Sequence, residues 1–81
     1  MNKLISVKPL EDYILELTYN EELRIFDLKP YLEKGFFSEL KKVNYFNQVF
    51  LSFDSIAWPN GQDLSPETLL IKSVPIEVIN S

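Results

Sequence analysis

Three neighbouring residues are the strongest candidates for chemistry in this chain: Trp58, Asn60 and Asp63. An indole, an amide and a carboxylate in one short loop can hold a small polar ligand. The same residues also have a structural explanation. Asn60-Gly61 is a turn pair that tolerates positive φ, and the Asp63 carboxylate can accept from loop amides as an Asx-type turn. We favour the structural interpretation of Asn60 and Asp63.

The single tryptophan has two possible roles. Trp58 is a candidate anchor for a protein partner, because tryptophan is enriched at interface hot spots. It is equally suited to fill the core under a folded loop. Pro59 biases Trp58 toward extended backbone, so that Asn60-Gly61 bends the chain back over the indole. We favour the core position and leave the anchor open.

Most catalytic and metal-binding chemistry is excluded by residue type. The chain has no histidine and no cysteine, which removes Ser-His-Asp and Cys-His systems and all His or Cys metal sites. Two isolated glycines cannot form a phosphate-binding loop. The acidic pairs Glu11-Asp12 and Glu21-Glu22 lie in expected turns, where solvated charges are common. We therefore expect a protein that is not an enzyme and that uses no metal or cofactor.

Length and charge narrow the function further. A chain of 81 residues has room for one domain, and its 46% hydrophobic share argues against disorder. The net charge is −4 and the eight basic residues are scattered, so we expect no direct nucleic-acid binding. No apolar run is long enough to span a bilayer and no signal peptide is recognisable, so we expect no membrane association. The lack of cysteine favours a reducing, cytoplasmic location.

Hydrophobic periodicity predicts an α+β fold with an antiparallel five-stranded sheet in two layers. A three-strand meander comes first, then a helical segment, a hairpin and a C-terminal helix. Leu15, Leu17 and Tyr19 should face the core together. Expected strands cover residues 4–9, 13–19, 23–27, 49–53 and 56–58, with helical segments over residues 28–32 and 36–43.

The last helix has a clear start signal at Ser65-Pro66-Glu67. The serine hydroxyl can cap the first turn, proline suits the first helical position, and glutamate complements the positive end of the helix dipole. This helix should therefore begin at Ser65 or Pro66.

An apolar tail follows the helix. We expect residues 1–73 to form one domain and residues 74–81 to pack on that domain or on a partner. Pro75 stops the helix, and Ile76 and Val78 share a face if the tail is extended. We favour packing on the domain, because so small a core leaves apolar surface to cover.

A set of residues spread over most of the chain carries a family resemblance: Phe26-Asp27-Leu28, Tyr31-Leu32, Gly35, Phe37, Leu40, Phe46, Trp58-Pro59-Asn60-Gly61, Asp63-Leu64, Pro66-Glu67 and Leu69. On these residues, the segment 7–73 resembles the bacterial domain-of-unknown-function family 2442, most specifically from Trp58 to Leu69. The resemblance implies a compact α+β domain with an antiparallel sheet, and it brings no established enzyme activity. Family members occur alone or joined to a helix-turn-helix domain, and many resemble the second gene of a toxin–antitoxin pair.

These observations predict a non-catalytic protein–protein interaction domain. The most specific version of this prediction is that the chain is an antitoxin-like partner of a small protein encoded next to it, and this version rests on the family resemblance. A homodimer is a further possibility. The alternative is a small-ligand or sensing module that uses the loop from Trp58 to Asp63. Candidate interaction residues are Trp58, Asn60, Asp63, Ile76 and Val78.

Overall fold

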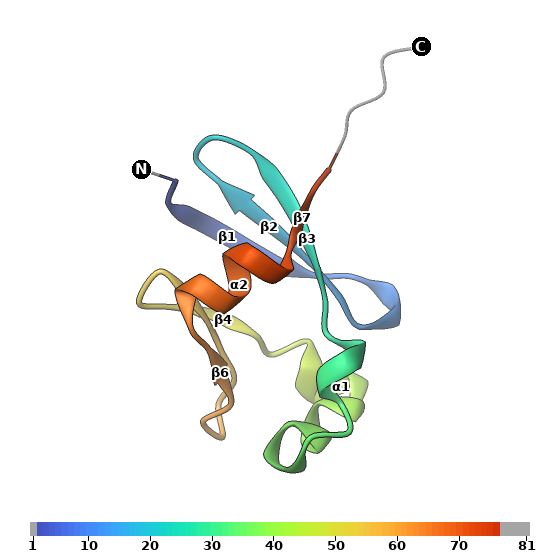
Figure 1. The fold of residues 1–81 in the computed structure, drawn as a ribbon. Coiled ribbons are helices and arrows are strands. Elements are labelled where there is room, and N and C mark those ends of the chain that lie inside the picture. The colour runs from blue at the N-terminus through green and yellow to red at the C-terminus, as the bar shows by residue number, and fades with distance from the viewer. Residues whose placement is uncertain (1, 77–81) are drawn as a thin grey trace.

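Two antiparallel sheets and several short helices make up residues 2–76, the part of the chain that the computed structural model describes (Figure 1). The larger sheet has the order β1-β2-β3-β7, with β1 (Leu4–Pro9), β2 (Ile14–Tyr19), β3 (Leu23–Asp27) and β7 (Val74–Pro75). The smaller has the order β4-β5-β6, with β4 (Phe50–Ser52), β5 (Ser55–Ala57) and β6 (Asp63–Leu64). The α-helices are α1 (Val43–Phe46) and α2 (Pro66–Lys72), and the 3₁₀ helices are η1 (Glu11–Tyr13), η2 (Lys29–Tyr31) and η3 (Gly35–Lys41).

The α+β class is confirmed, but the single five-stranded sheet expected from the sequence is not. The chain between β3 and β4 runs through η2, η3 and α1, so no short turn brings β4 beside the meander. Strand β4 pairs with β5 instead, and β5 pairs with β6. Strands β6 and β7 have two residues each, too few for a recognisable alternation.

The meander itself follows the predicted alternation. Leu15, Leu17 and Tyr19 of β2 are buried, and Phe26 of β3 lies opposite Leu15. The core continues from this face to the smaller sheet and the helices, so both sheets share it. Its members are Leu4, Leu15, Leu17, Tyr19, Phe26, Leu28, Leu32, Leu40, Phe46, Ile56, Trp58, Leu64 and Leu69.

The segment before β4 is the main correction to the predicted helices. Sequence spacing predicts a helix over residues 36–43 with Phe36, Leu40 and Val43 on its buried face. The structure has η3 and then α1, separated by Lys42 in an extended conformation. Only Leu40 is buried, while Phe36 and Val43 are exposed. The break at Lys42 rotates α1 relative to η3, so one continuous face does not form.

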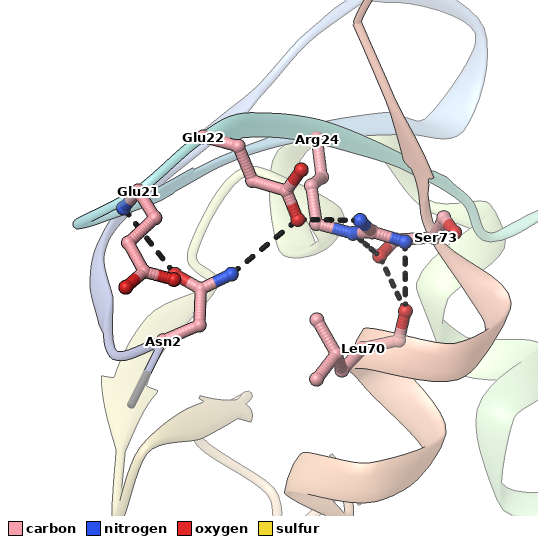
Figure 2. Close-up of polar contacts among 6 residues, drawn as sticks. All are labelled: Asn2, Glu21, Glu22, Arg24, Leu70 and Ser73. Carbon is pink, nitrogen blue, oxygen red and sulfur yellow. Dashed lines mark hydrogen bonds and ion pairs between the residues drawn. The ribbon is translucent and has the colours of Figure 1, made fainter.

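Helix α2 begins as predicted, with the Ser65 hydroxyl accepting a hydrogen bond from the Thr68 amide at 3.1 Å. Its other end is held by Arg24 of β3, a contact that sequence analysis missed (Figure 2). The guanidinium donates to the carbonyls of Leu70 and Ser73 at 3.1 and 2.8 Å. It also pairs with Glu22 at 2.6 Å. One side chain therefore fastens α2 to the larger sheet.

Replacing Arg24 should destabilise the fold. The side chain is only 14% exposed, and Arg24→Ala removes the guanidinium donor from the Ser73 carbonyl and one of the two donors from the Leu70 carbonyl. We expect a loss of about 2–3 kcal/mol in the free energy of unfolding, measured by urea titration. Arg24→Lys should recover only part of it, because an ammonium lacks the planar fork. Exposed Lys8→Ala is the control, and an equal loss there would contradict the assignment.

Candidate functional site

Trp58 lies in the core, with 1% of its surface exposed. Its indole Nε1–H donates to the Phe46 carbonyl at the end of α1, at 2.9 Å. The backbone closes around it: the Trp58 amide donates to the Gln62 carbonyl at 2.8 Å, and the Gly61 amide donates to the Trp58 carbonyl at 3.0 Å. Gly61 has φ 104°, a conformation that favours glycine. The indole is therefore not presented to a partner.

Asn60 is exposed, but its side-chain nitrogen and its backbone amide both have partners. Its side-chain Nδ2 donates to Glu39 Oε2 at 2.7 Å, and its backbone amide donates to the Tyr45 hydroxyl at 2.7 Å. Glu39 lies in η3 and Tyr45 in α1. The turn at Asn60-Gly61 is thus tied to the helical segment. A ligand that used the Asn60 amide would have to displace Glu39.

Gln62 is the polar residue that organises this loop, and sequence analysis did not single it out. It is 1% exposed, yet both ends of its amide are hydrogen-bonded. Nε2 donates to Glu39 Oε1 at 2.9 Å and to the Phe36 carbonyl at 3.1 Å, and Oε1 accepts from the Tyr45 hydroxyl at 2.6 Å. Glu39 therefore accepts hydrogen bonds from both Asn60 and Gln62. We call Glu39, Tyr45, Asn60 and Gln62 the loop network.

Asp63 does not tie down the loop as the sequence suggested. It lies in β6 opposite Ala57, it is exposed, and its carboxylate makes no hydrogen bond within residues 2–76. Gln62, and not Asp63, fixes the loop by side-chain hydrogen bonds. The structure therefore separates Asp63 from the polar contacts of its neighbours.

The start of the apolar tail forms β7 along β3. Val74 lies opposite Ile25, and the Ile76 amide donates to the Leu23 carbonyl at 2.9 Å. Because opposite residues share a face, Val74 and Ile76 lie on the face of the sheet away from Arg24 and α2. Both side chains are exposed. Val78, the other candidate in the tail, lies outside the described residues.

The tip of the β4–β5 hairpin presents a second aromatic residue that sequence analysis did not single out. Phe53 is 97% exposed and has φ 48°, and Asp54 beside it has φ 65°. Phe50 and Leu51 of β4 are also exposed. Phe50 and Leu51 point to opposite faces of the smaller sheet, but both lie on its edge strand, next to the turn that holds Phe53. We call Phe50, Leu51 and Phe53, along this edge, the hairpin patch.

Two shallow grooves lie away from the loop of Trp58. The larger, of about 410 Å³, includes Tyr31, over whose ring Lys34 places its ammonium 5.2 Å from the centroid. The smaller lies between the β1–β2 connection and α1. Neither is lined by Trp58, Asn60 or Asp63. Within residues 2–76, no three acidic residues are grouped so as to hold a metal ion.

Removing the Gln62 amide should unfold the loop network. Gln62→Leu removes one of the two donors to Glu39, the donor to the Phe36 carbonyl and the acceptor of the Tyr45 hydroxyl proton, so that only Asn60 still holds Glu39 and Tyr45 within the loop network. The free energy of unfolding should fall by about 2–4 kcal/mol in urea titrations followed by Trp58 fluorescence. Asp63→Asn is the matched control, and it should change stability by less than about 0.5 kcal/mol. Equal effects of the two substitutions would refute the role of Gln62.

The loop network should also make stability depend on acid. Hydrogen bonds from the Asn60 and Gln62 amides hold the pKa of Glu39 below its usual value of 4.5. Because the folded pKa is depressed, this stabilisation is complete above the unfolded pKa and is lost as pH falls through the folded pKa. Glu39→Gln should lower the free energy of unfolding at neutral pH. It should also make that free energy fall less steeply as the pH drops below 4.5. Urea midpoints measured from neutral to acidic pH test this prediction. If the midpoints of Glu39→Gln and of the unmodified chain fall equally at acidic pH, the prediction is contradicted.

Comparison with known proteins identifies a family for this chain. Within residues 2–76, no helix is long and apolar enough to cross a membrane. No curated protein and no solved structure matches the chain. The family model described as a protein of unknown function (DUF2442) matches residues 4–75, from the start of β1 to the end of β7. The chain therefore belongs to the DUF2442 family.

Proposed function

We propose that this chain is a non-catalytic protein–protein interaction domain that docks its partner through the hairpin patch. The partner is a small protein, and the patch supplies the apolar centre of the interface. Phe53 is the anchor, while Phe50 and Leu51 extend the contact along edge strand β4. Aromatic side chains at the centre of a patch carry most of the energy of many interfaces.

The observation that supports this proposal is the conformation and exposure of Phe53. Its φ of 48° is left-handed, which costs an L-residue roughly 1–2 kcal/mol. A hairpin of this kind favours asparagine or glycine at that position. With 97% of its surface exposed, the side chain adds no burial that offsets the strain. Backbone strain together with an exposed aromatic residue is typical of a functional site.

The hairpin is held in a fixed place. Asp54 Oδ1 accepts a hydrogen bond from the Leu4 amide at 3.2 Å, which ties the turn to β1 of the other sheet. Ile5 next to Leu4 is exposed as well. A rigid turn loses little conformational entropy when a partner binds, which favours affinity.

Charge points to the nature of the partner. The chain has a net charge of −4, so a basic protein would be attracted to it and would associate faster. The antitoxin-like arrangement, in which a neighbouring gene encodes such a partner, fits this charge and is our specific proposal. The absence of cysteine favours the cytoplasm as the place where the pair acts.

The ligand-binding alternative has weaker support from the geometry. A ligand that stacked on Trp58 would first have to open the loop, because the indole is buried. It would also have to break the hydrogen bonds from Asn60 and Gln62 to Glu39. The exposed hairpin patch needs no such rearrangement, and we therefore favour protein recognition.

Phe53→Asn separates recognition from folding. Asparagine suits the left-handed turn position, so the urea midpoint should stay equal or rise. Partner binding should fall by at least about tenfold, the loss of about 1.4 kcal/mol expected for a modest hot spot. The partner is captured from the native host with the tagged chain, identified by mass spectrometry, purified and titrated by calorimetry.

Ile71→Gln is the matched control, because Ile71 is another large apolar residue that is mostly exposed, and it lies on α2. It should bind the partner as the unmodified chain does. Unchanged affinity in Phe53→Asn, or equal loss in both variants, would refute the hairpin patch as the interface. The remaining case is that the hairpin patch binds a second copy of this chain, and light scattering of the purified chain tests it. If the unmodified chain is a stable dimer and Phe53→Asn is a monomer, the partner is a second copy.

A further inference from the structure

We propose that Asn60-Gly61 is a deamidation site that the native loop keeps unreactive, and that its conversion to aspartate opens the loop over Trp58. In this reaction the Gly61 nitrogen attacks Asn60 Cγ after losing its proton. A new N–C bond forms, the side-chain nitrogen leaves as ammonia, and a cyclic succinimide results. Water then opens the ring to aspartate or isoaspartate. Glycine permits the attack because it has no Cβ to obstruct the ring.

The native structure restrains both reacting groups. The Gly61 N–H donates to the Trp58 carbonyl at 3.0 Å, so the proton that must be lost is held in a hydrogen bond. Asn60 Nδ2 donates to Glu39 Oε2 at 2.7 Å, which holds the amide in place. The negative charge of Glu39 also opposes the anion that must form at the Gly61 nitrogen. Reaction therefore requires the loop to open.

Deamidation would turn the Asn60–Glu39 contact from attraction into repulsion. The product places a carboxylate where Nδ2 donated to Glu39 at 2.7 Å, and no donor remains between the two groups. Glu39 also accepts from Gln62 Nε2 at 2.9 Å, so repulsion at Asn60 disturbs the buried amide. The isoaspartate product adds one atom to the backbone and misaligns the turn that closes over Trp58.

The change runs in one direction. Ammonia is lost to solvent and the carboxylate does not revert in water. A loop that has opened once and reacted stays less stable than before, so it opens more often. Glu39 is thus the residue that protects Asn60 before the reaction and destabilises the product after it. Water is the only co-reactant.

The rate of reaction tests the protection. The folded chain and the urea-unfolded chain are incubated in mildly alkaline buffer, and the fraction of Asn60 converted is followed by peptide mass spectrometry. The folded chain should react at least about tenfold more slowly. Glu39→Ala should speed conversion in the folded chain several-fold, whereas Glu33→Ala, which removes an exposed carboxylate paired with Lys41, should not. Equal rates in folded and unfolded chains would overturn the proposal.

The product variant tests the consequence. Asn60→Asp should unfold at a lower urea concentration than the unmodified chain, with Trp58 emission shifted to the red. Adding Glu39→Gln to Asn60→Asp should restore part of the lost midpoint, because the introduced glutamine amide can donate to the introduced carboxylate while its oxygen still accepts from Gln62. If Asn60→Asp does not fold, folding of the double variant carries the test. An unchanged midpoint in Asn60→Asp, or failure of Glu39→Gln to restore part of the loss, would overturn the proposal.

Discussion

The burial of Trp58 with its N–H satisfied is the constraint on which the rest of this small structure depends. The indole follows β5 of the smaller sheet, and its hydrogen bond to the Phe46 carbonyl at 2.9 Å joins that sheet to the end of α1. Burying a tryptophan removes a large apolar area from water, but only if the polar N–H keeps a partner. The chain must therefore turn back after Pro59, and Gln62 fixes the returning strand.

Two aromatic residues near each other in the chain have opposite environments. Trp58 is buried, and its indole N–H and backbone amide are both hydrogen-bonded, so it serves the architecture. Phe53 is exposed in a left-handed turn, so it weakens the fold unless something binds it. This contrast is the physical basis for assigning recognition to the hairpin patch and structure to the loop network. The covalent reactivity of Asn60-Gly61 is suppressed by the same contacts that cover the indole.

Local patterns predicted what depends on local geometry. The start of α2 at Ser65-Pro66 and the buried face of β2 follow from capping and alternation, and both are confirmed. Pairing into two sheets was not predictable, because it depends on where the helical segment places β4. Arg24 and Gln62 were missed for a related reason. Their residue types are typical of surfaces, and their partners lie far away in the chain, up to 49 positions for Arg24 with Ser73.

The most direct test of this account is the accessibility of the single tryptophan. We expect Trp58 emission from the free chain to be blue-shifted and resistant to quenching by acrylamide. Adding the partner, or small polar metabolites, should leave that resistance unchanged, because the interface that we propose is the hairpin patch and not the indole. Emission near that of free tryptophan, with quenching that a bound metabolite relieves, would show an open site at the indole and contradict the account.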